Sequence, residues 1–194
     1  MKKIGIIGFA GAGKDTLADL IIKHYTTVPW QKSGFANALR EAVYALNPHV
    51  FVHTKDEVSM GYYPYAELID LYGYEWVKRN SDARETLQRM GTDVARKLWD
   101  NNFWVDIARE SAPKFSIFPD TRFANEATMI MDDGGIILRV TRANVTRVNE
   151  HSSEDYADNG FATYTIVNQP NNPDAMLFQL SKHPDLVRYF SEPI

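Results

Sequence analysis

A glycine loop near the start of the chain constrains the fold more than any other stretch. Residues 8–16 fit the spacing G-x-x-x-x-G-K, between the apolar run 4–7 and a run with helical periodicity, 17–22. This order predicts a phosphate-binding loop (P-loop), because glycines let backbone N–H groups turn toward a phosphate and the following helix adds positive potential. Lys14 is then expected to reach the β- and γ-phosphates of a nucleotide. The expected loop residues are Gly8, Ala10, Gly11, Ala12, Gly13, Lys14, Asp15 and Thr16.

The residue after the lysine departs from the usual P-loop pattern. Ser or Thr normally stands there and contacts Mg²⁺, whereas this chain has Asp15 followed by Thr16. Two alternatives remain open for Mg²⁺. Either the Asp15 carboxylate binds the ion or its waters, or the Thr16 hydroxyl takes the usual role.

Length and composition indicate one ordinary globular domain. The chain has 194 residues, 44% of them hydrophobic, and no Cys, so a disulfide framework and a thiol nucleophile are excluded. No apolar run approaches the ~20 residues of a membrane span, and we expect a cytoplasmic protein. The net charge of −4 argues against a broad nucleic-acid-binding face.

Strand and helix patterns alternate along the chain. This alternation predicts an α/β, three-layer P-loop fold, a parallel sheet flanked by helices with ligands at the carboxyl ends of the strands. The expected core covers about 1–48 and 82–194. An aromatic insert at about 49–81 interrupts it, on the side where a second substrate, the phosphate acceptor, would bind. A polar segment at about 142–161, within the second core range, is expected to form a lid. The insert is either a flap over a second ligand or a satellite core. Expected strands are 4–7, 31–35, 115–118, 136–141 and 163–167; expected helices are 17–22, 36–46, 82–98, 103–111, 125–133, 174–182 and 184–189.

Charged residues follow two of the expected strands. Asp120 comes after 115–118, where a Walker B aspartate would lie, and Arg122 follows it; Arg142 comes after 136–141. A small P-loop protein with such arginines fits phosphoryl transfer to a second small molecule, because the transition state needs cations more than a base. The further candidate arginines are Arg40, Arg84, Arg89, Arg96 and Arg147.

These residues resemble the phage deoxynucleoside monophosphate kinases, relatives of adenylate, thymidylate and dephospho-CoA kinases. The resemblance runs nearly end to end, and it includes the unusual Lys-Asp-Thr ending of the P-loop. The matching pieces are Gly13-Lys14-Asp15-Thr16, Phe35-Ala36, Leu39-Arg40, Leu87-Gln88, Gly91-Thr92-Asp93, Arg96, Trp104-Val105, Asp120-Thr121-Arg122-Phe123, Asn125-Glu126, Gly134-Gly135, Arg142 and His151-Ser152-Ser153-Glu154.

The resemblance implies transfer of the γ-phosphate of ATP, with Mg²⁺, to the 5′-phosphate of a deoxynucleoside monophosphate. Residues 8–16 would then hold the ATP phosphates, and Lys14 would stabilise the charge in transit. The implied acceptor side is Phe35, Arg40, Gln88, Thr92, Asp93, Asp120 and Arg122, with Asp120 orienting either the metal shell or the acceptor.

For the lid, the resemblance implies Arg142, Arg147, His151 and Glu154. Arg142 would close over the phosphates. Ser152, Ser153 and Glu154 have an equally good structural interpretation as the cap of a lid helix, with His151 as its exposed neighbour.

Other functions remain open at this point. The acceptor could instead be dephospho-CoA or a ribonucleotide, or the protein could be a regulatory ATPase that phosphorylates nothing. The resemblance also implies a homodimer, for which we expect residues 82–111 to form the interface. If a phage encodes this chain, the cytoplasm expected for it is that of the host. The bases accepted do not follow from the sequence.

Overall fold

The computed structural model describes residues 1–53, 58–143, 145, 162–170, 172 and 174–193. The chain forms two compact units. We call residues 1–35 and 108–194 the sheet unit, and residues 36–107 the hairpin unit. Among the residues described, no helix is both long enough and apolar enough to cross a membrane.

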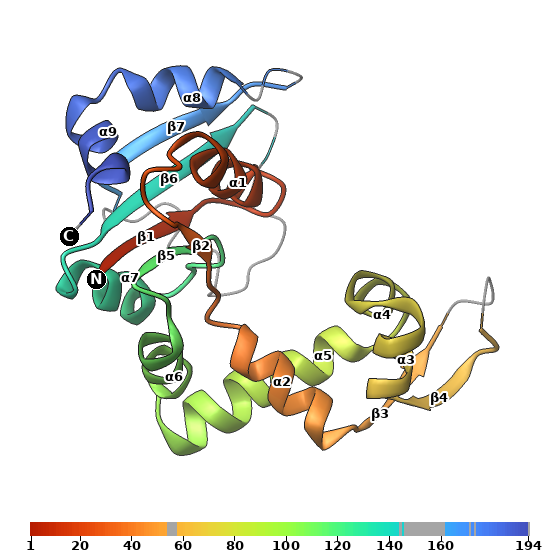
Figure 1. Ribbon diagram of the computed structural model, residues 1–194. Coiled ribbons are helices and arrows are strands. Elements are labelled where there is room, and N and C mark those ends of the chain that lie inside the picture. The colour runs from red at the N-terminus through yellow and green to blue at the C-terminus, as the bar shows by residue number, and fades with distance from the viewer. Residues whose placement is uncertain (54–57, 144, 146–161, 171, 173, 194) are drawn as a thin grey trace. The chain divides into compact units, whose positions relative to one another are not determined.

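A five-stranded sheet organises the sheet unit (Figure 1). Its order is β2-β5-β1-β6-β7, and each of its pairings is parallel, as the alternating pattern predicts. The strands are β1 (Lys2–Ile7), β2 (Gln31–Lys32), β5 (Phe115–Phe118), β6 (Ile136–Arg142) and β7 (Tyr164–Asn168). The carboxyl ends of the strands therefore meet at one edge of the sheet, next to the residues that follow β1. The α/β fold class is confirmed.

The first face of the sheet carries the main apolar core. Helices α1 (Lys14–His24), α8 (Asp174–Ser181) and α9 (Pro184–Ser191) supply its outer side. Alternate strand residues point into it, as the two-residue period of a strand requires. The core members from the strands are Ile4, Ile6, Phe115, Ile117, Leu138, Val140 and Ile166.

Helix α7 (Ala124–Asp132) packs against the second face. Gly5 permits this approach, because a Cβ at that position would lie only 2.6 Å from Cδ1 of Ile137 and 2.8 Å from Cδ1 of Ile130. The absence of a side chain in the middle of β1 is therefore a packing requirement of the sheet and α7.

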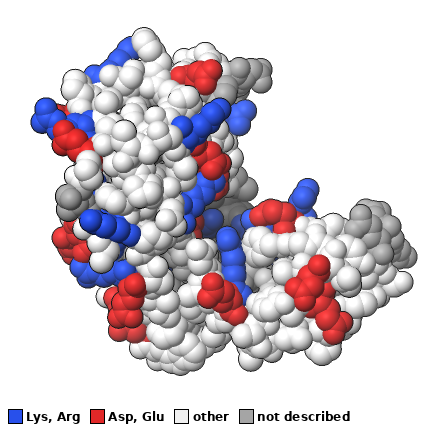
Figure 2. All heavy atoms as spheres, in the orientation of Figure 1, with Lys and Arg blue, Asp and Glu red and all other residues white. Residues whose placement is uncertain are grey.

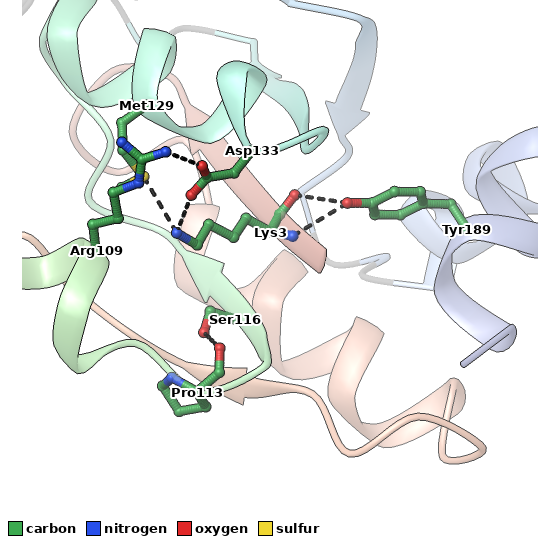
Figure 3. Close-up of polar contacts among 7 residues, drawn as sticks. All are labelled: Lys3, Arg109, Pro113, Ser116, Met129, Asp133 and Tyr189. Atoms are coloured by element: carbon green, nitrogen blue, oxygen red, sulfur yellow. Dashed lines mark hydrogen bonds and ion pairs between the residues drawn. The ribbon is translucent and has the colours of Figure 1, made fainter. Parts of the chain in front are cut away.

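A polar cluster lies at the amino-terminal end of β1, away from the P-loop (Figure 3). The fully buried Lys3 ammonium contacts the Asp133 carboxylate and, at 3.5 Å, Sδ of Met129. Arg109 pairs with the second oxygen of Asp133. Burial alone would raise the pKa of Asp133, but the hydrogen bonds and charges of Lys3 and Arg109 outweigh it and hold the pKa below its usual value.

Tyr189 fastens α9 to the same strand (Figure 3). Its hydroxyl donates to the carbonyl of Lys3 at 3.1 Å and accepts the N–H of Lys3 at 3.2 Å. Burial raises the pKa of Tyr189 to about 12, partly offset by its bond to the Lys3 backbone. The hydroxyl is therefore protonated and able to donate at any physiological pH.

The hairpin unit contains an antiparallel pair of strands, β3 (His49–Val52) and β4 (Gly61–Pro64). Two short helices follow the hairpin, α3 (Tyr65–Tyr72) and α4 (Tyr74–Asn80). The hairpin itself was not predicted, because four-residue strands are too short to show a clear alternation. Its buried members and those of the surrounding helices are Val43, Val50, Val52, Tyr65, Leu68, Val77, Ala83 and Leu87.

Helix α2 (Asn37–Leu46) packs on a long helical segment in the same unit. The helix expected over 82–98 is α5 (Ala83–Gln88) followed without a gap by a π-helix, η1 (Arg89–Trp99). A Cβ on Gly91 would lie 2.8 Å from Cδ2 of Leu39, so glycine allows the two segments to approach closely. Helix α6 (Phe103–Ser111) follows with the bounds expected from its pattern.

Candidate active site

The P-loop joins β1 to α1 at the carboxyl edge of the sheet (Figure 1). Gly8, Gly11 and Gly13 have φ angles of 148°, 79° and 104°, in the region that favours glycine. Gly8 is also required sterically, since a Cβ there would lie 2.4 Å from the carbonyl oxygen of Val140. The N–H of Ala12 donates to Phe9 at 3.1 Å and closes the turn. The three glycines and this hydrogen bond therefore give the loop its tight turn.

Helix α1 begins at the end of this loop. Its first backbone hydrogen bond runs from the N–H of Leu17 to the carbonyl of Gly13 at 3.0 Å. The N–H groups of the first turn have no carbonyl partner within the helix, so they form a donor site for an anion.

Lys14 bends back over the loop from the first position of α1. Its Nζ donates to the carbonyl oxygens of Gly8 at 2.7 Å and Phe9 at 3.1 Å. These contacts place the ammonium at the start of the loop, within reach of phosphates held by the same backbone.

Asp15 and Thr16 lie exposed on the first turn of α1. The Asp15 side chain is 79% exposed and lies 3.6 Å from Nζ of Lys32, which pairs more closely with Asp19 at 2.8 Å. Within the described ranges, no group of three or more His, Cys, Asp or Glu side chains could hold a metal ion alone. Mg²⁺ bound with a nucleotide commonly uses one or two protein oxygens together with phosphates and water, so the oxygen donors of Asp15 and Thr16 fit it.

Asp120 lies two residues beyond β5 and ties that strand end to the segment after β2. Its Oδ1 accepts the backbone N–H of Phe35 at 3.2 Å. The Phe35 ring stacks on Phe118, with centroids 4.8 Å apart. The structure thus brings together two residues, Asp120 and Phe35, that the resemblance assigns to the acceptor.

The loop that carries Arg122 is fixed through its backbone. Oε2 of Glu126, which is 2% exposed, accepts the N–H groups of Arg122 at 2.7 Å and Phe123 at 3.1 Å. The hydroxyl of Thr121 donates to the carbonyl of Phe118 at 2.9 Å. A rigid turn therefore presents the exposed Arg122 side chain beyond the end of β5.

The last two strands of the sheet both reach the P-loop. Arg142 ends β6, and its Nη1 donates to the carbonyl of Gly11 at 3.5 Å. Asn168 ends β7, and its Nδ2 donates to the carbonyl of Ala12 at 2.8 Å. Arg142 was expected at the nucleotide, whereas Asn168 was not.

Four of the expected acceptor-side residues belong to the hairpin unit. The guanidinium of Arg40 lies over the Tyr74 ring, 4.6 Å from its centre, and lines a cavity of about 430 Å³ with Tyr44 and Tyr65. Asp93 pairs with Lys97 at 2.6 Å. The other two are Gln88, exposed at the end of α5, and Thr92, half-buried in η1.

No family model matches this chain, whereas two curated viral proteins are similar to it over most of its length. The putative deoxynucleotide monophosphate kinase of Acanthamoeba polyphaga mimivirus is 25% identical over 176 residues, covering 79% of this chain and 81% of that protein. The deoxynucleoside-5′-monophosphate kinase of Escherichia phage T5 is 22% identical over 222 aligned positions, covering 86% of this chain and 89% of that protein.

The resemblance to the deoxynucleoside monophosphate kinases is thereby confirmed. Both alignments span most of the chain, so the kinase family is supported for the two units together and not for the P-loop alone.

Three of the four residues expected in the lid, Arg147, His151 and Glu154, lie outside the described residues. Arg142 is described, and it contacts the P-loop.

On the face drawn in Figure 2, acidic and basic side chains are interspersed.

Sequence reasoning missed three residues that support the site. Lys32 contacts both Asp15 and Asp19, Glu126 holds the Arg122 backbone, and Asn168 holds the P-loop. Two of them carried a usable signal: Asn168 ends a strand at the same sheet edge as Arg142, and Glu126 is the third residue of its helix, where a Glu side chain commonly accepts the backbone N–H groups just before the helix. The Lys32 contacts depend on how separate segments pack.

Proposed function

We propose that this protein is a deoxynucleoside monophosphate kinase, which transfers the γ-phosphate of ATP to the 5′-phosphate of a deoxynucleoside monophosphate. The products are ADP and the deoxynucleoside diphosphate. The main support is the geometry of the P-loop, in which three glycines at positive φ and the returning Lys14 side chain build an anion site at the carboxyl edge of the sheet. The relatives' names support this reaction within the wider group of P-loop enzymes.

Binding of ATP follows from the loop. Its backbone N–H groups and the N-terminus of α1 bind the phosphate oxygens, because both present hydrogen-bond donors and positive potential to an anion. Nζ of Lys14 exchanges its contacts with the Gly8 and Phe9 carbonyls for the β- and γ-phosphates. That exchange places a positive charge where negative charge develops during transfer.

Mg²⁺, when bound with ATP, neutralises charge on the β- and γ-phosphates. Asp15 or Thr16 would hold it. Nζ of Lys32 lies 3.6 Å from the Asp15 carboxylate. Arg142 adds a second cation beside the loop at Gly11.

The acceptor phosphate needs its own cations, because two phosphate groups repel as they approach. Arg122 supplies a guanidinium group, which matches phosphate oxygens in pairs. Asp120 fixes the Phe35 segment, and through it the end of β2. The transition state then gains charge stabilisation, whereas no strong base is required at the acceptor oxygen.

The test is ADP release by the purified protein with Mg-ATP. The acceptor panel is dAMP, dGMP, dCMP, dTMP, AMP and dephospho-CoA, with a control that lacks an acceptor. Strong stimulation by one or more deoxynucleotides supports the proposal and reports base selectivity. Stimulation only by AMP or dephospho-CoA assigns a different acceptor, and slow turnover that ignores every acceptor indicates a regulatory ATPase.

We also propose a homodimer that uses residues 82–111. Leu98 and Trp99 in this segment are large apolar side chains with 73% and 58% of their surface exposed in the single chain. Sedimentation equilibrium should give twice the chain mass, and Leu98→Glu should shift it toward the monomer. A monomer in the unmodified protein would contradict this proposal without affecting the kinase reaction.

A further inference from the structure

Two neighbouring strand ends hold two consecutive carbonyls of the P-loop. Arg142 and Asn168 are register partners in the β6–β7 ladder. Nδ2 of Asn168 donates to the carbonyl of Ala12 at 2.8 Å, whereas the bond from Arg142 to the carbonyl of Gly11 is longer, at 3.5 Å. Asn168 therefore makes the better-formed of these two contacts.

The contact at Ala12 fixes the direction of a particular N–H group. In a trans peptide unit the C=O and N–H bonds point in opposite directions. Because the Ala12 carbonyl points toward Asn168, the N–H of Gly13, which belongs to the same peptide unit, points away from it. Gly13 immediately precedes α1, so its N–H lies among the donors that a helix N-terminus offers to an anion.

Asn168 also occupies the space that a side chain at position 13 would need. A Cβ on Gly13 would lie 2.3 Å from Nδ2 of Asn168. The half-buried asparagine therefore closes the outer side of the loop, and the glycine makes room for it. The two residues form one unit of packing although they are far apart in the sequence.

We infer that Asn168 is a positioning residue for the nucleotide phosphates: it holds the Ala12–Gly13 peptide with its N–H directed toward the triphosphate. This inference rests on the proposed function, since it concerns the same ATP site. It assigns to the end of β7 a role in affinity for the phosphate chain, and none in binding the acceptor.

Calorimetric titration with inorganic tripolyphosphate and with ATP tests the inference. Asn168→Leu keeps approximately the size of the side chain and its neutrality but cannot donate a hydrogen bond, and Asn168→Ala removes both size and donor. We expect the Kd of both ligands to rise about tenfold in each variant, as for the loss of one good hydrogen bond that organises several others. The KM of the acceptor should stay unchanged.

Gln179→Ala is the matched control. The Gln179 side chain accepts the N–H of Val167 at 2.9 Å and donates to its carbonyl at 2.8 Å, one residue before Asn168. Its removal should lower the melting temperature by loosening β7, yet leave the Kd of ATP within about twofold. An equal loss of affinity in Gln179→Ala would show that only the stability of β7 matters and would overturn the inference.

The remaining outcomes separate this inference from the proposed function. If the unmodified protein binds ATP and folded Asn168→Leu binds it equally well, the inference is wrong and the kinase proposal stands. If Asn168→Leu does not fold, Asn168→Ala decides by the same criterion. If the unmodified protein binds neither tripolyphosphate nor ATP, both fail.

Discussion

The carboxylate of the buried Glu126 accepts a 2.7 Å hydrogen bond from the backbone N–H of Arg122. The same oxygen accepts the N–H of Phe123 at 3.1 Å, so one side chain sets the path of the backbone that carries a candidate acceptor-binding arginine.

Removing this carboxylate should lower the stability of the fold and raise the KM of the acceptor. Glu126→Ala leaves two backbone donors without this acceptor and should lower the free energy of unfolding by roughly 1–3 kcal/mol. The KM of the acceptor should rise because Arg122 is less well placed. Urea unfolding and steady-state kinetics measure the two effects, and Glu110→Ala, an exposed residue of α6, serves as the control.

Arg122 itself should act on the acceptor and not on ATP. Arg122→Ala removes a guanidinium from the proposed acceptor phosphate and should raise the KM of the deoxynucleotide at least tenfold with a small change in the KM of ATP. Arg188→Ala, 72% exposed on α9, should change neither. A rise confined to the KM of ATP would show that Arg122 serves the other substrate.

Lys14→Ala should reduce turnover by far more than tenfold, because the Lys14 ammonium stabilises the transferred phosphoryl group. A tenfold loss alone corresponds to ~1.4 kcal/mol of activation free energy. Lys23→Ala removes a lysine from the last turn of the same helix and should leave turnover unchanged. Activity of Lys14→Ala within tenfold of the unmodified enzyme would refute the P-loop assignment.

The Mg²⁺ dependence of turnover distinguishes the role of Asp15 from that of Thr16. We expect one of Asp15→Asn and Thr16→Ala to raise, several-fold, the Mg²⁺ concentration that gives half-maximal turnover. The same variant should lose the extra rise in melting temperature that Mg²⁺ gives in the presence of ATP. Asp19→Asn is the matched control, because Asp19 shares Lys32 with Asp15. A normal Mg²⁺ response in both variants would show that neither residue binds the ion.

The Lys3–Asp133 pair predicts a pH dependence of stability. Because the pKa of Asp133 is lower in the folded protein than its ordinary value of 3.8, its contribution is complete above that value and is lost as the pH falls through the folded pKa. Asp133→Asn should cost roughly 3 kcal/mol at pH 7, since it leaves the buried Lys3 ammonium without its counter-charge.

The difference in unfolding free energy between Asp133→Asn and the unmodified protein should shrink steadily below about pH 4. Urea unfolding at several pH values measures it. Asp185→Asn on α9 is the control, and a difference that is independent of pH would show that the carboxylate charge does not contribute.

Local patterns were sufficient for most of the elements. The strand at 115–118 has the expected bounds because a short, mostly apolar run marks it. The helix at 103–111 has the expected bounds because Pro113 follows it. The strand expected over 31–35 is shorter, since β2 ends at Lys32 although the N–H of Ser33 still donates to Ile117 at 2.8 Å. Short strands depend on a neighbour for their length, and the sequence does not show the neighbour.

The local conformation of the candidate site was predictable where it depends on consecutive residues, and its long-range contacts were not. The P-loop, Lys14 and the strand-end position of Arg142 follow from consecutive residues. The contacts of Asn168 with Ala12, and of Lys32 with Asp15, require the strand order β2-β5-β1-β6-β7, which long-range pairing decides. For the same reason the identification of the acceptor-side residues stays a prediction.

The amide of Gln179 has a consequence for how copies of this protein behave in concentrated solution. Strand β7 is at the edge of the sheet, where free backbone groups would invite a strand from a second molecule. Because Gln179 occupies both the N–H and the C=O of Val167, an incoming chain meets a side chain that already satisfies the edge. We therefore expect this contact to oppose strand addition at Val167, so that Gln179→Ala stored at high concentration forms β-rich precipitate before the unmodified protein does.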